Sequence, residues 1–272
     1  MMWIAIVVLV LLAIYLYLIH PASSRPDDSQ LRGWFYAHRG LHDGNVNVPE
    51  NSMEAFRLAV EKGYGMELDV QLTRDKQLVV HHDGSTKRVC GVDKLIRETD
   101  YADLPLLPDG SKIPLFSEVL SMVDGRTPII VEVKHHGSPW ANAEAAWQDL
   151  KEYSGPFCVE AFNPVAMKYF RENAPHIVRG QLASGGKWDK EELNYVSYFA
   201  LKNLLVNVVS RPHFVSYSVP TDKVFGMWLM KHLFKPYLAC WTVRSQKVLD
   251  YAKQQGYQYP IFELFTPSQE NK

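Results

Sequence analysis

Residues 65–83 read Gly-Met-Glu-Leu-Asp-Val-Gln-Leu-Thr-Arg-Asp-Lys-Gln-Leu-Val-Val-His-His-Asp, two strand-like runs joined by a short polar connection. The runs Gly65–Leu72 and Leu78–His82 are separated by five residues, which are too few for the crossover that joins parallel strands. We therefore expect an antiparallel hairpin here, with Asp69 opposite His82 across the pair.

Outward from this hairpin, short apolar runs alternate with amphipathic patterns. Further strands are expected at Trp34–His38, Ile129–Lys134, Phe157–Phe162, Ile177–Leu182, His213–Tyr217, Leu238–Val243 and Pro260–Leu264. Helices are expected at Asn51–Lys62, Ser117–Val123, Ala141–Tyr153, Pro164–Asn173, Asp189–Val209, Asp222–Phe234 and Ser245–Gln255. The alternation predicts an α/β fold, a (β/α)8 TIM barrel in which the hairpin return is an extra strand.

The first 19 residues differ from the rest of the chain, because no charged side chain interrupts the run from Met2 to Ile19. Eighteen helical residues rise about 27 Å, close to the hydrocarbon thickness of a bilayer. A signal peptide cleaved near residues 21–23 is the alternative, but the run lacks a cationic segment before it. We expect a transmembrane anchor at residues 1–19, a polar linker at 20–32 and one barrel domain at 33–272.

Basic residues follow the apolar run and none precedes it, with Arg25, Arg32 and Arg39 the first in the chain. The positive-inside rule then predicts a single-pass membrane protein with its catalytic domain in the cytoplasm. The three cysteines, at positions 90, 158 and 240, show no metal or redox spacing and are expected to be reduced thiols. A net charge of −1 argues against nucleic-acid binding.

Carboxylates occur within two of the apolar strands. Glu67 and Asp69 are two residues apart, so both leave the same face of a strand, and Glu132 and Lys134 repeat this spacing. For either pair alone, an exposed hairpin face or a structural salt bridge explains the spacing as well as a functional site does. Two such pairs on two barrel strands favour a site, and three carboxylates without a sulfur ligand favour Mg²⁺, Ca²⁺ or Mn²⁺ over zinc.

Two histidines end strand-like runs near these carboxylates. His38 is followed by Arg39, whose planar guanidinium suits phosphate oxygens, and His82 is followed by an aspartate. Histidines at strand ends often only form hydrogen bonds, and His81 should face away as a structural residue. Cleavage of a phosphodiester, however, needs a base and an acid, and two imidazoles can share these roles.

Two further residues are candidates for supporting roles. Glu50 lies in Pro49-Glu50-Asn51, where an acidic residue is common in a first helical turn. If it is functional, support for Arg39 or the metal site is expected rather than metal ligation. Trp241 is expected in the barrel core or at its mouth, where it could form a wall against an apolar or glycerol moiety.

Taken together, these motifs resemble those of the glycerophosphodiester phosphodiesterase family. The resemblance rests on residues 37–40 (Ala-His-Arg-Gly), 49–52 (Pro-Glu-Asn-Ser), 67–70 (Glu-Leu-Asp-Val), 79–83 (Val-Val-His-His-Asp) and 131–134 (Val-Glu-Val-Lys), and extends to 113–120, 162–164 and 241–243. It covers roughly residues 34–265. The family often has threonine at the position of Ser52, and its last strand commonly reads Ile-Ile-Thr-Asp, whereas residues 259–264 here read Tyr-Pro-Ile-Phe-Glu-Leu.

The resemblance implies a TIM-barrel hydrolase that releases sn-glycerol 3-phosphate and an alcohol from glycerophosphodiesters. By this similarity, His38 and His82 are the general acid–base pair, and Glu67, Asp69 and Glu132 hold a divalent cation. Arg39 and Lys134 would contact the phosphate, and Glu50 would support the site.

Two other functions remain open from the sequence. The same fold could act on a lysophospholipid or a phospholipid headgroup, because an anchored barrel lies near lipid. The chain could also be a catalytically inactive module that binds a phosphate or lipid headgroup. That function would predict the loss of a catalytic histidine or a metal carboxylate, and all five are present.

Overall fold

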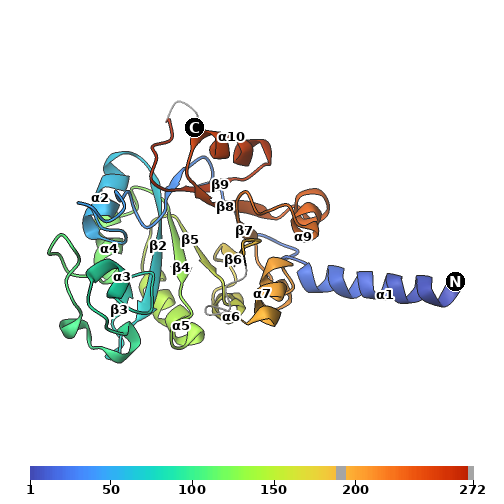
Figure 1. The fold of residues 1–272 in the computed structure, drawn as a ribbon, viewed down its shortest axis with the longest axis horizontal. Helices are drawn as coiled ribbons and strands as arrows, with labels where there is room; N and C mark the ends of the chain where they lie inside the picture. Colours follow the sequence, from blue (N-terminus) through green and yellow to red (C-terminus); the bar gives the residue numbers. More distant parts are fainter. Residues whose placement is uncertain (188–193, 269–272) are drawn as a thin grey trace.

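Eight parallel strands close into a barrel in the computed structural model, which describes residues 1–187 and 194–268 (Figure 1). They are β1 (Tyr36–Ala37), β2 (Gly65–Leu72), β4 (Ile129–Val133), β5 (Phe157–Ala161), β6 (Arg179–Ala183), β7 (Phe214–Ser218), β8 (Tyr237–Val243) and β9 (Tyr259–Phe262). The short strand β1 pairs with both β2 and β9, and these two pairings close the ring. The predicted (β/α)8 barrel is therefore confirmed.

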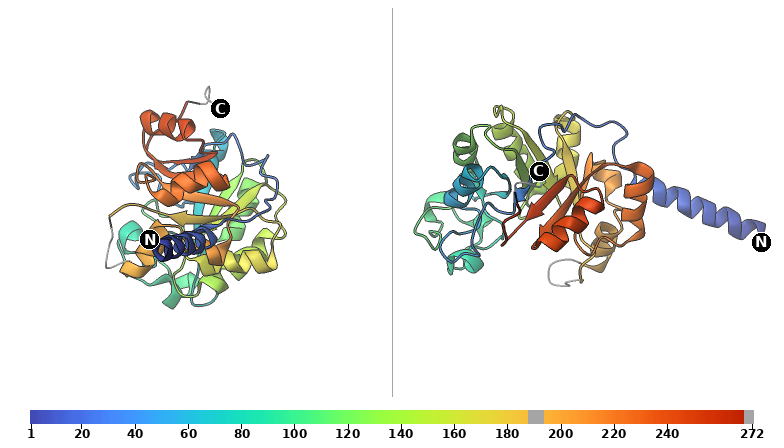
Figure 2. Two further views of the ribbon diagram at one scale, coloured as in Figure 1. Left: turned by 90° about the vertical axis from the view of Figure 1, so that its right-hand side faces the viewer. Right: turned by 90° about the horizontal axis from the view of Figure 1, so that it is seen from above.

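Helices follow the strands along the chain and cover the outside of the barrel (Figures 1 and 2). They are α2 (Met53–Glu61), α4 (Phe116–Val123), α5 (Pro139–Leu150), α6 (Pro164–Asn173), α7 (Tyr195–Lys202), α8 (Asn207–Ser210), α9 (Phe225–Leu229) and α10 (Gln246–Gln254). The side chain of Ser52 caps α2 by accepting a hydrogen bond from the Ala55 amide at 3.1 Å. The serine that departs from the family pattern thus has a role in starting this helix.

The expected hairpin is present, but its predicted register is wrong by one residue. Strand β3 (Leu78–Val80) pairs antiparallel to β2 with Leu72 opposite Leu78, which places Asp69 opposite His81 rather than His82. The turn is one residue longer than a two-residue loop, because Lys76 adopts a positive φ of 65° and completes a three-residue connection. His81 is buried, and its amide donates to the Asp69 carbonyl at 2.9 Å, as suits a structural residue.

The segment after β3 forms a small apolar cluster of its own. It contains α3 (Lys87–Cys90) and the short 3₁₀ helices η1 (Ile96–Glu98) and η2 (Tyr101–Asp103). The buried members of this cluster are Val79, Val89, Ile96, Leu107 and Ile113. Strand β3 and the segment that follows it thus pack beside the barrel and are not part of its closed ring of strands.

The helix predicted at Asp189–Val209 is wrong as one continuous element. Residues 188–193 lie outside the described residues, and the remainder forms α7 and α8 with a break between them. Leu204 at the break has a φ of 60° and is fully buried. The amide of Leu205 donates to the Ala200 carbonyl at 2.8 Å, so the chain turns at the end of α7 to bury Leu204. The helix predicted at Asp222–Phe234 begins at Phe225 and ends in a π-helical turn, η3 (Met230–Phe234).

Side chains inside the barrel form two layers. The lower layer is apolar and includes Tyr36, Ile130, Cys158, Phe214 and Tyr259. Because alternate residues of a strand share a face, the next inward position after Ile130 is Glu132, and the next after Cys158 is Glu160. An acidic layer therefore lies above the apolar one, towards the carboxyl ends of the strands.

The helix α1 (Met2–Ile19) projects away from the barrel, and only its last turns pack against it (Figures 1 and 2). Among residues 20–32, Asp28 is fully buried and accepts a hydrogen bond from the Tyr259 hydroxyl at 2.6 Å, and Leu31 is also buried. This polar segment thus lies along the barrel below the apolar layer. The division into anchor, linker and barrel domain stays a proposal.

A buried histidine at the lower end of the barrel should make stability depend on pH. His213 is 3% exposed, and Nη1 of Arg179 lies 3.0 Å from its Nε2 atom. Burial and then the charge of Arg179 lower the pKa of His213 from 6.5 to about 3. Because the folded-state pKa lies below the unfolded one, the unfolded chain takes up a proton at this histidine more readily than the folded chain. The free energy of unfolding is therefore highest above pH 6.5 and decreases as the pH falls towards 3.

We expect the free energy of unfolding to fall by about 1 kcal/mol between pH 6.5 and 5.5 in the native chain, relative to His213→Asn. Urea unfolding of the detergent-solubilised chain at both pH values measures it. The exposed His176 provides the control, since His176→Asn should keep the native pH dependence. The same pH dependence in native chain and His213→Asn would contradict the prediction.

Candidate active site

A cavity of about 180 Å³ opens at the carboxyl ends of the barrel strands. It is lined by His38, Arg39, Glu67, His82, Glu132, Glu160, Phe162, Leu182, Trp241, Thr242, Arg244, Ile261 and Glu263. Both predicted catalytic histidines, two of the predicted metal carboxylates, Arg39 and Trp241 are therefore brought together. Asp69, Lys134 and Glu50 lie just behind this lining and contact it through hydrogen bonds and ion pairs.

The carboxylates of Glu67, Asp69 and Glu132 form a buried cluster. One oxygen from each lies within 4.8 Å of the others, because Asp69 and Glu132 are register partners on β2 and β4. Burial and then the charges of Asp69, Glu132 and Glu160 raise the pKa of Glu67 well above its usual value. The arrangement thus concentrates negative charge that a bound cation would relieve.

This cluster fits a hard divalent cation. Its donor atoms are all carboxylate oxygens. The buried Oδ1 atom of Asp69 accepts no hydrogen bond from the described residues, and the Lys134 ammonium lies 3.3 Å from it. Buried carboxylates are costly unless cations face them, so three of them in one cluster favour a bound cation in addition to this ammonium. Mg²⁺, Ca²⁺ and Mn²⁺ prefer such oxygen ligands, whereas zinc sites usually include histidine or cysteine.

Polar side chains hold these carboxylates in place. Lys134 Nζ lies 2.8 Å from Glu132 Oε1 and 3.3 Å from Asp69 Oδ1, and Asn51 Nδ2 donates to Asp69 Oδ2 at 2.8 Å. Burial alone would raise the pKa of Asp69, but the charges of Lys134, His82 and Arg39 and the Asn51 hydrogen bond keep it well below its usual range. Asp69 therefore stays ionised more readily than Glu67.

His38 is oriented by a carboxylate at the end of the last strand. Its Nδ1 atom lies 2.8 Å from Glu263 Oε1, and its Nε2 atom lies 3.9 Å from Glu67 Oε2. Burial is the main influence and, despite the hydrogen bond with Glu263, lowers the pKa of His38 below 6.5. A neutral imidazole with one nitrogen fixed by a carboxylate can accept a proton at the other.

The turn after His38 shapes the adjoining part of the site. Arg39 has a φ of 55°, and its amide donates to Glu67 Oε2 at 3.0 Å. Gly40 has a φ of 78°, and a Cβ atom there would lie 2.8 Å from the Cβ of Ala55. This position therefore accepts only glycine, which explains the third residue of the His-Arg-Gly motif.

His82 has an equivalent carboxylate partner. Its Nδ1 atom lies 2.6 Å from Asp83 Oδ1, and Arg88 Nε donates to the other oxygen of Asp83 at 2.6 Å. The His82 side chain is 30% exposed, more than that of His38 at 12%. Both histidines thus have Nδ1 held by a carboxylate within one acidic cavity.

Glu50 connects the two arginines of the site. Its Oε1 atom accepts from Arg39 Nη1 at 2.7 Å, and Arg88 donates to both of its oxygens at 2.7 and 2.8 Å. Burial would raise the pKa of Glu50, but the hydrogen bonds from Arg88 and the charges of both arginines lower it to about 2. Glu50 therefore contacts Arg39 directly, and it also brings Arg88 into the site.

Sequence reasoning missed two further carboxylates that line the cavity. Glu160 is 1% exposed, is the register partner of Glu132, and has a pKa raised to about 8 by burial and then by the Glu132 charge. A charged residue inside the apolar run Phe157–Ala161 was the available signal, the same one that identified Glu132. Glu263 follows β9, where the chain departs from the family's usual last strand, so its acidic role there was not expected.

Comparison with known proteins decides which family this site belongs to. The model of the glycerophosphoryl diester phosphodiesterase family matches residues 38–259, which is most of the chain.

The chain belongs to the glycerophosphoryl diester phosphodiesterase family.

Individual relatives of this phosphodiesterase align with a shorter part of the chain than the family model does. A glycerophosphodiester phosphodiesterase from Caldanaerobacter subterraneus is 30% identical over 164 residues, which are 55% of this chain and 66% of that protein. A human lysophospholipase D is 35% identical over 114 residues, 36% of this chain and 35% of that protein. The chain thus matches just under two thirds of the first relative and about a third of the second.

A solved structure supports the fold over a longer range. A phosphodiesterase from Oleispira antarctica, in complex with the product sn-glycerol 3-phosphate, superimposes with a TM-score of 0.69. It is 20% identical and covers 85% of this chain and 93% of its own. At this identity the likeness shows the barrel fold.

The link between Glu263 and His38 can be tested directly. We expect Glu263→Gln to lower kcat by about 10- to 100-fold, because the amide can no longer fix the His38 tautomer as a carboxylate does. Steady-state assays on a soluble glycerophosphodiester give kcat and KM separately. Glu61→Gln on the exposed end of α2 is the control and should leave kcat unchanged. An unchanged kcat in Glu263→Gln would remove this carboxylate from the site.

Proposed function

We propose that this chain hydrolyses glycerophosphodiesters to sn-glycerol 3-phosphate and an alcohol. The observation that carries the proposal is the pairing of each histidine with its own carboxylate, His38 with Glu263 and His82 with Asp83, around one cluster of three buried carboxylates. A base, an acid and a cation site within one cavity are together able to cleave a stable phosphodiester.

The roles of the residues follow from their positions. His38, neutral because burial lowers its pKa, is proposed to take the proton of the attacking hydroxyl at Nε2. His82 is proposed to give a proton to the oxygen of the departing alcohol. Arg39 lines the cavity and presents a guanidinium to phosphate oxygens. Lys134 is proposed to share this phosphate contact, although in the structure its ammonium pairs with Glu132 and Asp69.

Glu67, Asp69 and Glu132 are proposed to hold one divalent cation, Mg²⁺ or Ca²⁺, with Mn²⁺ also compatible. When bound, such a cation neutralises negative charge that develops on the phosphate oxygens. Trp241 is proposed to form a wall against the substrate, because its ring lines the cavity and meets Phe162 edge-on, with 5.5 Å between the ring centroids.

The attacking group is either water or the glycerol 2-hydroxyl. In the second case the hydroxyl oxygen bonds to phosphorus, the alcohol leaves with a proton from His82, and a cyclic phosphate forms that water then opens. Rapid-quench phosphorus NMR distinguishes the two, since only the second route produces a transient cyclic glycerophosphate.

A substrate panel tests the proposed function. The purified full-length chain in detergent is incubated with glycerophosphocholine, glycerophosphoethanolamine and glycerophosphoglycerol, with and without a chelator. We expect release of sn-glycerol 3-phosphate that stops on chelation and returns with Mg²⁺, Ca²⁺ or Mn²⁺. If none of these substrates is cleaved with any of the three cations, the chain is better described as a non-catalytic phosphate- or headgroup-binding module.

A lysophospholipid is the second candidate substrate. The human relative is named a lysophospholipase D, and the lining of the cavity includes the apolar side chains Phe162, Leu182, Trp241 and Ile261. Turnover of lysophosphatidylcholine against glycerophosphocholine separates the candidates. A higher kcat/KM for the lysolipid would favour the second one.

We also propose that α1 anchors the chain as a single-pass membrane protein with the barrel in the cytoplasm. The helix has 18 residues, a mean hydropathy of 2.9 and almost no buried surface. Two reporter enzymes are fused in turn to the carboxyl terminus, one that works only in the cytoplasm and one that works only outside the cell, and we expect only the first to be active. Activity of the second alone would reverse this topology, and loss of α1 from the mature chain would identify a signal peptide.

A further inference from the structure

The outer surface beside α1 carries exposed apolar side chains on three separate elements. They are Tyr195, Val196 and Phe199 on α7 and Phe225, Trp228 and Leu233 on α9 and η3, and each is between 48% and 76% exposed. These six residues are called the docking face below. Helices α7 and α9 lie at the end of the barrel from which α1 projects (Figures 1 and 2).

The three segments meet at Gly226. A Cβ atom at this position would lie 3.1 Å from the Tyr15 hydroxyl of α1 and 3.4 Å from the Asn203 carbonyl at the end of α7. The Tyr15 ring stacks on Phe225 with 6.0 Å between centroids, and Phe225 stacks on Trp228 at the same distance. A continuous row of aromatic rings thus runs from α1 onto the docking face.

The exposed part of α1 is too short to hold the docking face far from a bilayer. Residues 2–14 are exposed, whereas the last turns from Tyr15 to Ile19 pack on the barrel. Thirteen helical residues rise about 20 Å, well short of the roughly 30 Å of bilayer hydrocarbon. If α1 spans the membrane, its last turns must also lie within it or at its surface, and the residues packed against them are brought to the headgroup layer.

Hydrogen bonds hold α1 in this position. Arg211 Nη1 donates to the carbonyls of Tyr17 and His20, at 2.9 and 2.8 Å, and Asn207 Nδ2 donates to the Ile19 carbonyl at 2.9 Å. These bonds tie the end of α1 to α8 and to the residue that follows it. These hydrogen bonds therefore fix the position of the barrel relative to the end of α1.

The charge of this region suits an anionic surface. Between residues 195 and 235 the sequence contains Lys202, Arg211, Lys223, Lys231 and Lys235 but only one carboxylate, Asp222. That carboxylate is buried and paired with Lys231 at 2.8 Å. The segment is thus clearly cationic in a chain whose net charge is −1.

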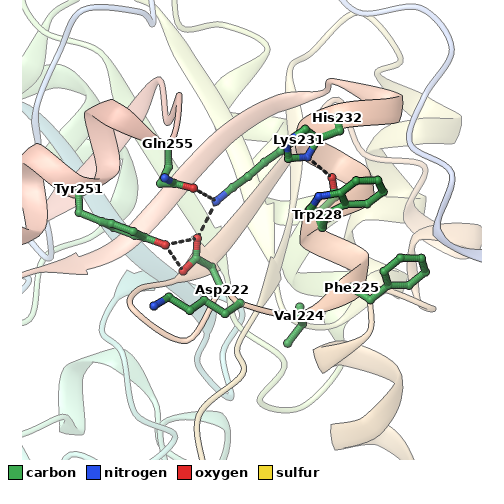
Figure 3. Close-up of a pocket in the computed structure, with 9 residues that line it drawn as sticks. Asp222, Val224, Phe225, Trp228, Lys231, His232, Tyr251 and Gln255 are labelled. Carbon is green, nitrogen blue, oxygen red and sulfur yellow. Dashed lines mark hydrogen bonds and ion pairs between the residues drawn. The ribbon is translucent and has the colours of Figure 1, made fainter.

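A groove of about 460 Å³ in this region is lined by both aromatic and charged side chains (Figure 3). One side carries the exposed rings of Phe225 and Trp228, and the other carries Lys231, Asp222 and Tyr251 in a hydrogen-bonded group. Aromatic rings next to lysines are typical of surfaces that lie at the boundary between acyl chains and headgroups.

From this geometry we propose that the docking face lies against the headgroup layer of an anionic phospholipid bilayer, and that the barrel is held on the membrane at two places, by α1 and by this face. The proposal rests on the membrane anchoring proposed above. Aromatic and aliphatic side chains enter the boundary between headgroups and acyl chains, and Lys202, Lys223 and Lys235 contact lipid phosphates, because Lys231 is paired with Asp222 and Arg211 is bonded to α1.

Spin labels on the full-length chain test this proposal. With Cys90 replaced by serine and the buried Cys158 and Cys240 retained, single cysteines are introduced by Val196→Cys, Leu233→Cys, Val46→Cys and Leu9→Cys. The labelled chains are reconstituted in nanodiscs of phosphatidylcholine and phosphatidylglycerol. Electron paramagnetic resonance then compares the accessibility of each label to oxygen and to a water-soluble nickel chelate.

We expect the ratio of oxygen to nickel accessibility at Val196 and Leu233 to be several-fold higher than at Val46, which is as exposed as Val196 and lies on the loop after β1. Leu9 in α1 reports whether the anchor is inserted, and cleavage of glycerophosphocholine by the same samples reports the proposed function. A lipid-like value at Leu9 with water-like values at Val196 and Leu233 would overturn the docking face while leaving the anchor and the enzyme in place.

Charge substitutions give an independent check. Phe199→Asp combined with Leu233→Asp should return the label at Val196 to the value found at Val46, because carboxylates are repelled by the anionic surface. Leu106→Asp, on an exposed loop outside the face, should leave it unchanged. A Val196 label that remains lipid-like in the double variant would show that these side chains do not hold the face to the bilayer.

Discussion

Replacing His82 by alanine is expected to lower kcat by about 10²- to 10⁴-fold without unfolding the chain. The imidazole lines the cavity, and its Nδ1 atom is held 2.6 Å from Asp83, which leaves Nε2 to deliver a proton to the departing alcohol. Its side chain is 30% exposed, so truncation creates no cavity in the core. Steady-state turnover of glycerophosphocholine and circular dichroism measure the two halves of this result.

The leaving group gives this experiment a finer readout. A substrate with a nitrophenol leaving group needs little protonation, so the loss caused by His82→Ala should be much smaller on it than on glycerophosphocholine. His176→Ala, on an exposed loop, serves as the control. If His82→Ala turned over glycerophosphocholine at the native rate, the proposed acid role would have to move to another residue.

Asp69→Asn is expected to weaken binding of the divalent cation by about 100-fold or more and to remove most turnover. The substitution keeps the size of the side chain but removes the carboxylate that Asn51 and Lys134 hold in the cluster. Isothermal titration with Mg²⁺, Ca²⁺ and Mn²⁺ measures the affinity without relying on activity. Chelation of the native chain should have the same effect on turnover and should be reversed by adding the cation.

Asp109→Asn in an exposed turn is the matched control for this change. It removes the same charge from the chain without touching the cluster, so both affinity and turnover should stay at native values. Equal cation affinity in Asp69→Asn and the native chain would show that the cation is held elsewhere.

The barrel could be predicted from the sequence because its signals are local. All nine expected strands are present, since apolar runs such as Gly65–Leu72 and Ile129–Val133 are buried on both faces and end at polar turns. The hairpin register could not be predicted, because it depends on Lys76 adopting a left-handed conformation that no sequence pattern marks. The break at Leu204 could not be predicted either, because this leucine also adopts a left-handed conformation. Its burial outweighs the continuous helical pattern of the sequence.

The site was predictable where its residues share a strand or a short motif. Glu67 and Asp69 share a face by simple alternation, and the return of the hairpin brings His82 close to them. The partners from distant strands were not predictable in this way. Glu263 reaches His38 only because β1 and β9 become neighbours on closure, and Arg88 reaches Glu50 from the excursion after β3.

The closure of the barrel through β1 has a consequence for fragments of this protein. The amide of His38 donates to the Phe262 carbonyl at 2.8 Å, and Glu263 is the very next residue. A chain cut just after residue 259, where the family match ends, would retain every motif from His38 to Lys134. It would nonetheless lose both the neighbour that positions the strand before His38 and the carboxylate that orients the imidazole. For this fold, a complete set of motifs is therefore no guarantee of a complete enzyme, because one half of the proposed acid–base pair depends on the last few residues of the barrel.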